Sequence, residues 1–197
     1  MASTSHYFWL RGDLQRARAC NRVVHELAVQ ANDVNHELIT LVFAELLSAS
    51  VGDLLNAVKV GREILVKAHS IGSRAYYFAL GNLGAALTEL GELDEALAWS
   101  RECVPFKSRG DSLWVRLDAF SLLAFKRGHA KTSALVLGCG DAICSTKNHP
   151  RQPNEKRVHN LALAALQGVF SKTELKKLMS DGAALSVEEA ARIALAD

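Results

Sequence analysis

The sequence predicts an all-α fold, a solenoid of four stacked helix pairs closed by a C-terminal helical cap. One observation is a glycine motif that recurs at a nearly constant interval, with glycines 40, 39 and 37 residues apart: Gly12, Gly52, Gly91 and Gly128. A second series of helix-ending residues, offset from the first, recurs 40 and 38 residues apart: Asn32, Gly72 and Gly110. Periods in this range, filled with helical sequence, are typical of repeats that bury their apolar faces against their neighbours.

The two series divide the repeat region into segments with the usual length of a globular helix. Gly or Asn can adopt the left-handed conformation that ends a helix, and the Asp or Ser that follows can cap the next helix. Apolar residues within the segments recur at three- and four-residue steps, as Leu80, Leu83, Leu87 and Leu90 do. We therefore expect helices over residues 2–11, 13–30, 34–50, 53–69, 74–90, 92–104, 112–127 and 130–146.

Prolines mark two further boundaries. Pro105 lacks an N–H and clashes with the turn before it, so the sixth helix should end near Cys103. Pro150 and Pro153 lie in a segment without an apolar stripe, which predicts a loop over residues 148–154. Three shorter helices should follow, over 155–169, 172–180 and 186–196, the last two with capping-box spacing. The predicted organisation is repeats over 1–147, in units of about 1–31, 32–71, 72–109 and 110–147, then the loop and capping helices over 155–197.

The composition argues against several classes of function. The formal net charge of +2 is small and the basic residues are scattered, so no direct contact with nucleic acid is expected. No apolar run reaches the roughly 18 residues of a membrane span, and the N-terminus does not resemble a signal peptide. We therefore expect a cytoplasmic protein without membrane contact. The 4 cysteines form no C-x-x-C pair, so neither a metal nor a cofactor is expected.

No arrangement of residues indicates catalysis. The 7 histidines are well separated, and no G-x-S-x-G elbow or H-E-x-x-H motif is present. Carboxylate pairs such as Asp94 and Glu95 lie at expected helix starts, where they complement the helix dipole. The chain also lacks a phosphate-binding loop of the type G-x-x-x-x-G-K-[ST] and an evident helix-turn-helix. We expect no enzymatic activity.

The third repeat resembles the tetratricopeptide motif. Residues 80–84, Leu-Gly-Asn-Leu-Gly, are similar to the first helix of that motif, and the turn and second helix follow with Leu87, Gly91, Leu93 and Ala96. Residues 133–142 and 182–190 resemble segments that close the repeat arrays of ATP-binding bacterial transcriptional regulators. These regulators are the LuxR-type and winged-helix relatives among the signal-transduction ATPases with numerous domains. The chain departs from them at residues 138–140, Gly-Cys-Gly, where the family usually has Ala around one Gly.

The resemblance implies a right-handed solenoid of tetratricopeptide-like pairs that acts as a regulatory or sensor domain in a bacterial transcriptional regulator. It would bind a protein, a peptide or a small effector on its concave face, and ATPase and DNA-binding domains would lie upstream of Met1. A further expectation is a homodimer in which the uncapped N-terminal repeat stacks against a second copy. A free-standing adaptor that scaffolds a protein complex and a peptide-pheromone receptor remain as alternatives.

Carrying the motif positions over gives candidate ligand contacts on the first helix of each pair. The strongest is Asn82. Asn is unfavourable inside a helix, so its presence there indicates a specific contact of the side chain. The Asn82 amide would form hydrogen bonds either with the backbone of a bound peptide or with an adjacent helix. The other candidates are polar residues that solvation alone would also explain. The full set is Arg74, Asn82, Glu89, Arg116, Asp118 and Lys126.

Overall fold

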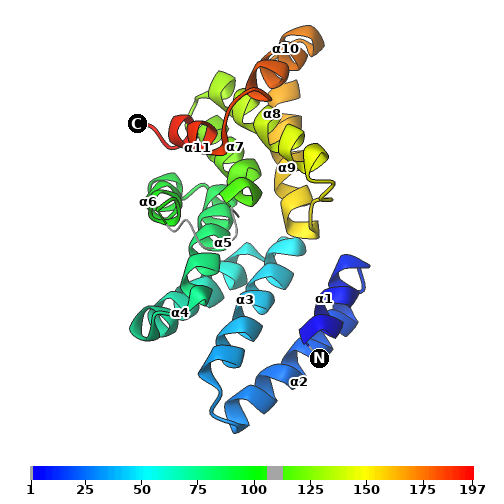
Figure 1. The fold of residues 1–197 in the computed structure, drawn as a ribbon, viewed down its shortest axis with the longest axis vertical. Coiled ribbons are helices and arrows are strands. Elements are labelled where there is room, and N and C mark those ends of the chain that lie inside the picture. Colours follow the sequence, from blue (N-terminus) through cyan, green and yellow to red (C-terminus); the bar gives the residue numbers. More distant parts are fainter. Residues whose placement is uncertain (1, 106–112) are drawn as a thin grey trace. The chain divides into compact units, whose positions relative to one another are not determined.

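The structure, a computed structural model, describes residues 2–105 and 113–197 and confirms the all-α prediction (Figure 1). Every regular element within these residues is helical, and no strand is present among them. The helices are α1 (Ala2–Leu10), α2 (Leu14–Gln30), α3 (Val34–Ser50), α4 (Leu54–Ile71), α5 (Arg74–Leu90), α6 (Leu93–Cys103), the 3₁₀ turn η1 (Leu113–Arg116), α7 (Leu117–Lys126), α8 (Ala130–Thr146), α9 (Pro153–Gln167), α10 (Lys172–Gly182) and α11 (Val187–Ala194).

The helix-ending residues have the backbone conformation that the sequence predicts. Positive φ angles occur at every glycine of the first series and at two members of the second: Gly12, Gly52, Gly91, Gly128, Asn32 and Gly72. The Asp that follows Gly or Asn caps the next helix, and three such carboxylates accept a hydrogen bond from a backbone N–H three residues on: Asp13, Asp33 and Asp53. The predicted turn at Gly110 and Asp111 lies outside the described residues.

Removal of one of these caps is expected to cost about 1 kcal/mol of stability. In Asp13→Ala, the Arg16 N–H would lose the carboxylate oxygen that accepts its hydrogen bond at 3.1 Å. Asp13→Asn keeps a capping oxygen and serves as the matched control. Urea denaturation should place the unfolding midpoint of the alanine variant below that of both the wild type and Asp13→Asn. Equal midpoints for the two variants would show that the cap contributes nothing.

Several helix boundaries differ from the prediction. The first turn of the expected 112–127 helix is the 3₁₀ turn η1, a common form of a helix N-terminus, and Ser112 lies outside the described residues. Pro153 belongs to α9 and not to the loop, because proline suits the first turn of a helix, and Gln152 and Glu155 form a capping box around it. The helix α10 continues to Gly182, whereas α9 and α11 end two residues earlier than expected.

The chain divides into two compact units, Met1–Ala86 (unit 1) and Leu87–Asp197 (unit 2), and the division falls within α5. In unit 1, α1 packs on α2, α2 on α3, and α3 on α4. Trp9 anchors the first helix because its side chain is fully buried, and its indole N–H donates to the Ser50 hydroxyl at 2.8 Å. The Trp9 ring also meets Phe43 edge to face. Contacts between successive helices therefore organise this unit.

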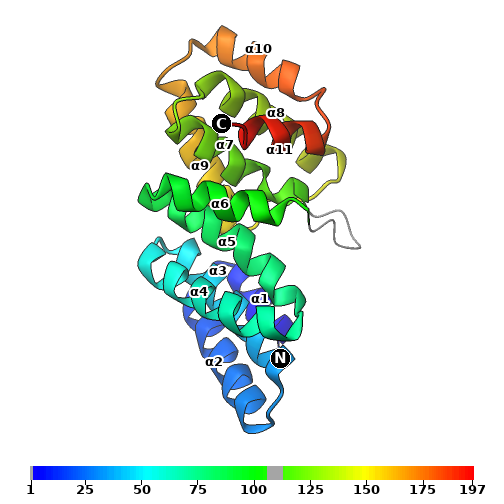
Figure 2. The ribbon, with the colours of Figure 1, turned by 90° about the vertical axis from the view of Figure 1, so that its left-hand side faces the viewer.

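In unit 2, the antiparallel helices α7 and α8 form the centre (Figure 2). The last three helices pack against this pair: α9 against α7, α10 against α8, and α11 against both. The shared apolar core consists of Leu122, Ala134, Leu137, Val158, Ala162, Leu166 and Leu175.

Two glycines bring α8 and α10 into backbone contact. A Cβ atom built on Gly138 would overlap the main chain of Met179, and a Cβ on Gly182 would overlap the main chain of Leu135. The absence of a side chain at both positions is thus a condition for this close approach.

Candidate functional site

The residue with the strongest sequence argument, Asn82, is turned into unit 1. Its exposed fraction is 7%, and its side-chain amide donates to Glu45 Oε2 on α3 at 3.1 Å. Glu45 is fully buried, so this hydrogen bond helps to accommodate a carboxylate inside the protein. The hydrogen bond to an adjacent helix is therefore the reason for an Asn in the middle of α5. The expectation that Asn82 offers its amide to a ligand on an exposed face is wrong.

Glu89 and Lys126 are likewise engaged within unit 2. The Glu89 side chain is 5% exposed, and its Oε2 accepts from Arg157 Nη2 on α9 at 2.6 Å. Lys126 Nζ donates to the Glu89 carbonyl at 2.9 Å. Burial raises the pKa of the Glu89 carboxyl, although the charges of Arg157 and Lys126 oppose this rise. These contacts fasten the last turn of α5 to α7 and α9, so Glu89 is not an exposed ligand contact.

The remaining candidates fall in different surroundings. Arg74 is exposed at the start of α5 in unit 1, Arg116 is half-buried at the end of η1, and Asp118 is buried in the first turn of α7. Arg74 and Asn82 belong to unit 1, whereas Glu89, Arg116, Asp118 and Lys126 belong to unit 2.

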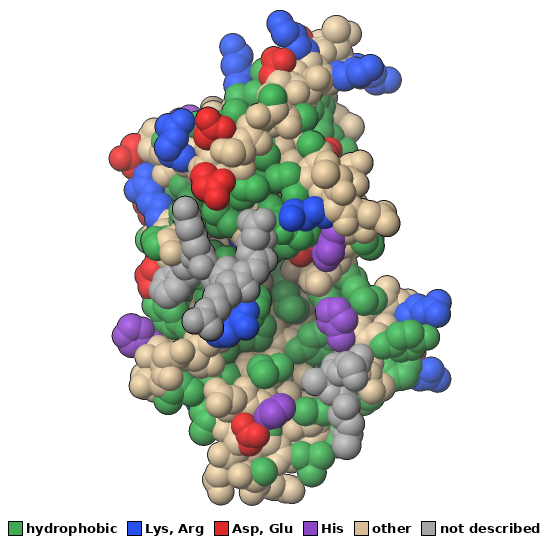
Figure 3. Space-filling model, in the orientation of Figure 1, with side chains coloured by type: hydrophobic (Ala, Val, Ile, Leu, Met, Phe, Trp, Pro, Cys, Tyr) green, Lys and Arg blue, Asp and Glu red, His purple; other side chains and the backbone are tan. Residues whose placement is uncertain are grey.

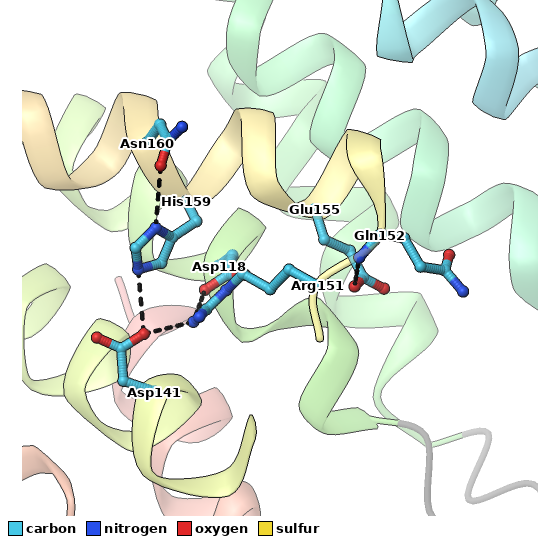
Figure 4. Close-up of polar contacts among 7 residues, drawn as sticks. All are labelled: Asp118, Asp141, Arg151, Gln152, Glu155, His159 and Asn160. Atoms are coloured by element: carbon cyan, nitrogen blue, oxygen red, sulfur yellow. Dashed lines mark hydrogen bonds and ion pairs between the residues drawn. The ribbon is translucent and has the colours of Figure 1, made fainter. Parts of the chain in front are cut away.

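Asp118 belongs to a polar network that joins four segments of unit 2 (Figure 4). Arg151, in the loop before α9, forms a bidentate pair with Asp118, with Nε–Oδ2 and Nη2–Oδ1 distances of 2.7 and 3.0 Å. Arg151 Nη2 also contacts Asp141 Oδ1 on α8 at 2.6 Å. Asp141 Oδ1 is 3.0 Å from His159 Nε2 on α9. The guanidinium therefore ties the 147–152 loop to α7 and α8, and His159 ties α9 to the same carboxylate.

The electrostatics of the network favour the charged forms of Arg151, Asp141 and His159. Burial works against the charge of Arg151, but the hydrogen bonds and charges of Asp118 and Asp141 raise the pKa of its guanidinium. Burial also opposes ionisation of Asp141, yet the contacts with His159 and Arg151 lower the pKa of that carboxyl. The hydrogen bond to Asp141 raises the pKa of His159. Each ionised group is thus stabilised by a partner of opposite charge.

The chemistry available to this network is limited. A His–Asp pair can act as a general base, but a reaction also needs a nucleophile or a substrate position beside it. Cys144 interacts with the charges of Arg151 and Asp118, yet burial raises the pKa of its thiol, which disfavours the reactive thiolate. Within residues 2–105 and 113–197, no group of three His, Cys, Asp or Glu side chains could hold a metal ion. The geometry is that of a structural ion-pair network.

The His159 contact predicts a pH dependence of stability. A His whose pKa is higher in the folded state stabilises that state fully below its unfolded pKa of about 6.5, and this contribution disappears as the pH rises through the folded pKa. We expect the urea midpoint of the wild type to fall over this range and that of His159→Gln to change less. His129→Gln, at an exposed position of the same unit, should follow the wild type. Parallel curves for all three proteins would contradict the role of this contact.

A groove in unit 1 is the feature that sequence reasoning missed. It lies along the antiparallel helices α2 and α3, is bounded at one end by the start of α4, and has a volume of about 730 Å³. Its floor is formed by α3 residues, among them Leu41, Ala44 and Leu47, and its α2 wall carries Arg18 and Arg22. No repeated motif of the sequence marks it, because its lining residues come from α2, α3 and the start of α4.

The polar wall of the groove is fixed by hydrogen bonds. Asn21 is 8% exposed and its amide donates to the Thr40 carbonyl at 2.9 Å. The Thr40 hydroxyl donates to the Glu37 carbonyl at 2.6 Å, so it accepts from His25 Nδ1 at 2.9 Å. In the neutral His25 ring the proton therefore lies on Nδ1 and Nε2 is an acceptor. These contacts hold the side chains in place before any ligand arrives.

No known family model, curated protein or solved structure matches the chain. In the part of the chain that the structure describes, no helix has the length and apolar character needed to cross a bilayer.

Proposed function

We propose that the chain is a non-catalytic helical-repeat domain of a bacterial transcriptional regulator, a sensor that binds a protein, a peptide or a small effector. In this proposal the helix pairs stack as a right-handed solenoid of tetratricopeptide-like units with a C-terminal cap. The observation that carries the proposal is the repeated turn geometry, because successive turns share a left-handed residue and an Asp cap: Gly12 with Asp13, Asn32 with Asp33, and Gly52 with Asp53. Recurrence of the same turn and the same Asp cap at a fixed period is typical of a repeat architecture.

The surface of unit 1 supports a binding role. Large apolar side chains reach the solvent on α1 to α4, the lower part of Figure 3, and Leu55 and Val66 are 75% and 77% exposed. Apolar side chains at this exposure lose contact with water when a partner covers them, which favours association. The fixed polar wall of the α2–α3 groove adds groups that can orient a ligand. Binding, and not catalysis, is therefore the function that these features favour.

A homodimer through the first helix pair is part of the proposal. Tyr7 and Leu10 on α1, and Val23 and Leu27 on α2, are each about half exposed. Val23 and Leu27 are four residues apart and so share one face of α2. Sedimentation equilibrium should detect a dimer that Val23→Glu weakens. A strictly monomeric wild type would contradict this part of the proposal and leave the binding role to the groove.

The reading frame upstream of the Met1 codon tests the regulatory role. In-frame nucleotide-binding and DNA-binding domains are expected there, with this chain as the ligand-sensing end of the same protein. A ligand that fits one conformation of the helical array would shift the population of the whole protein toward that conformation. A frame without such domains would contradict the regulator proposal and favour the free-standing adaptor. The peptide-pheromone receptor loses its main support, because Asn82 is buried against Glu45.

A further inference from the structure

We propose that the α2–α3 groove of unit 1 binds an acidic, extended peptide segment of a partner protein. This inference rests on the proposed binding function and specifies its ligand. The groove is distinct from the positions that the family resemblance suggests, because none of those six residues lines it. Three properties of the groove carry the inference: its charge, its hydrogen-bonding groups and its length.

The charge of the groove is complementary to an acidic ligand. Arg18 and Arg22 line the α2 wall, and Arg18 makes no ion pair with any described residue. Arg22 contacts Glu26 only at 3.8 Å, and both side chains are exposed, so this pair holds the guanidinium weakly. The carboxylate at the end of the groove, Asp53, caps α4 by accepting from the Asn56 N–H. The two guanidinium groups are therefore available to carboxylates, which they bind in a bidentate manner.

A side-chain acceptor of a largely buried residue lies beside the same space. The Asn21 amide nitrogen donates to the Thr40 carbonyl, whereas Asn21 Oδ1 accepts no hydrogen bond from the described residues, and the residue as a whole is 8% exposed. Asn21 lines the groove, so a ligand N–H can satisfy this oxygen there. A peptide supplies backbone N–H groups, and a simple organic acid does not. This acceptor therefore favours a peptide over a free carboxylic acid.

The dimensions agree with a short extended segment. The α2 wall runs from Gln15 to His25, and ten residues of helix rise about 15 Å. An extended chain spans about 15 Å with four to five residues. Ala19 and Ala44 keep the groove open, and Leu41 and Leu47 offer an apolar floor for one side chain of the ligand. The groove thus accommodates acidic residues flanking an apolar one.

The test uses two immobilised libraries of pentapeptides that differ only in Glu or Gln at the second and fourth positions. The wild-type chain should be retained about tenfold more by the Glu library, the equivalent of one good charge-assisted contact. The double variant Arg18→Glu, Arg22→Glu should lose this preference. The control Arg11→Glu, Lys59→Glu changes the net charge equally at exposed residues of unit 1 outside the groove and should keep it. Ala44→Leu, which narrows the floor, should weaken retention on both libraries.

Equal retention by the Glu and Gln libraries would overturn the acidic specificity, and absence of retention would overturn the peptide site itself. A preference that persists in the Arg18 and Arg22 variant would place the site elsewhere. None of these outcomes bears on the upstream reading frame, so failure of this inference is distinguishable from failure of the regulator proposal. Circular dichroism of each variant should show the helical content of the wild type, because Arg18 and Arg22 are exposed.

Discussion

Gly138→Ala is expected to destabilise unit 2 by about 3 kcal/mol, the upper part of the range for overpacked sites. The new Cβ atom would overlap the backbone of Met179, and a backbone cannot move aside as a flexible side chain can. The α8–α10 crossing would have to separate, which would open the core around Leu137 and Leu175. Urea denaturation, followed by circular dichroism, measures this loss.

Gly140→Ala is the matched control for this prediction. It lies on the same helix two residues away, and its Cβ atom would meet Asp118 Oδ1 at 3.4 Å and Leu117 Cβ at 3.5 Å, which are tolerable contacts. Alanine is the better helix former by about 1 kcal/mol, so this variant should be as stable as the wild type or slightly more stable. Equal unfolding midpoints for Gly138→Ala and Gly140→Ala would refute the backbone contact between α8 and α10.

Arg151→Met is expected to cost about 3 kcal/mol at neutral pH, since removal of one member of a buried ion-pair network leaves the other charges without compensation. The Arg151 and Asp118 side chains are 16% and 9% exposed, so water can replace little of what the guanidinium supplies. The loop before α9 would lose its attachment to α7 and α8. Urea denaturation at neutral pH measures the cost.

Two comparisons separate the charge effect from the loss of packing. Acidification should reduce the difference between Arg151→Met and the wild type, because protonation removes the Asp141 charge that the guanidinium compensates. Combining Arg151→Met with Asp118→Asn and Asp141→Asn should recover much of the stability at neutral pH. An equal loss at every pH, with no recovery in the combined variant, would mean that Arg151 acts through its methylene groups and not through its charge.

The sequence predicts the helices of this protein well, because their ends depend on local chemistry. Gly52 and Asp53 form a turn and a cap within a few residues, so a periodic series of such pairs is sufficient to place helix after helix. The error at Pro153 has a local origin as well, since proline serves both in loops and in the first turn of a helix.

The site residues were harder to predict because their partners are distant in sequence. Arg151 lies 33 residues after Asp118, and Arg157 lies 68 residues after Glu89. No periodicity links such pairs, and a polar residue on a helix gives no sign of whether it faces water or a partner. Gly138 itself was one usable signal, because a glycine inside a helix is less favourable than alanine and therefore indicates a close approach of another backbone.

The groove escaped prediction for a related reason. Asn21 and Thr40 come together through the packing of α2 on α3, and neither residue belongs to the repeat motif. Asn82, by contrast, carried the expected signal of a functional residue, but Glu45 explains its presence in α5. An Asn within a helix therefore indicated a buried polar partner in this protein and not a ligand.

A two-dimensional amide NMR titration of the whole chain with the Glu pentapeptide pool locates ligand binding most directly. We predict shift changes along α2 and α3, with the Asn21 and Thr40 signals among the most affected, at peptide concentrations of about 1 mM or below. Changes confined to the surroundings of Arg74, Arg116 and Lys126 would instead return the site to the positions inferred from the family resemblance, and would contradict binding in the groove.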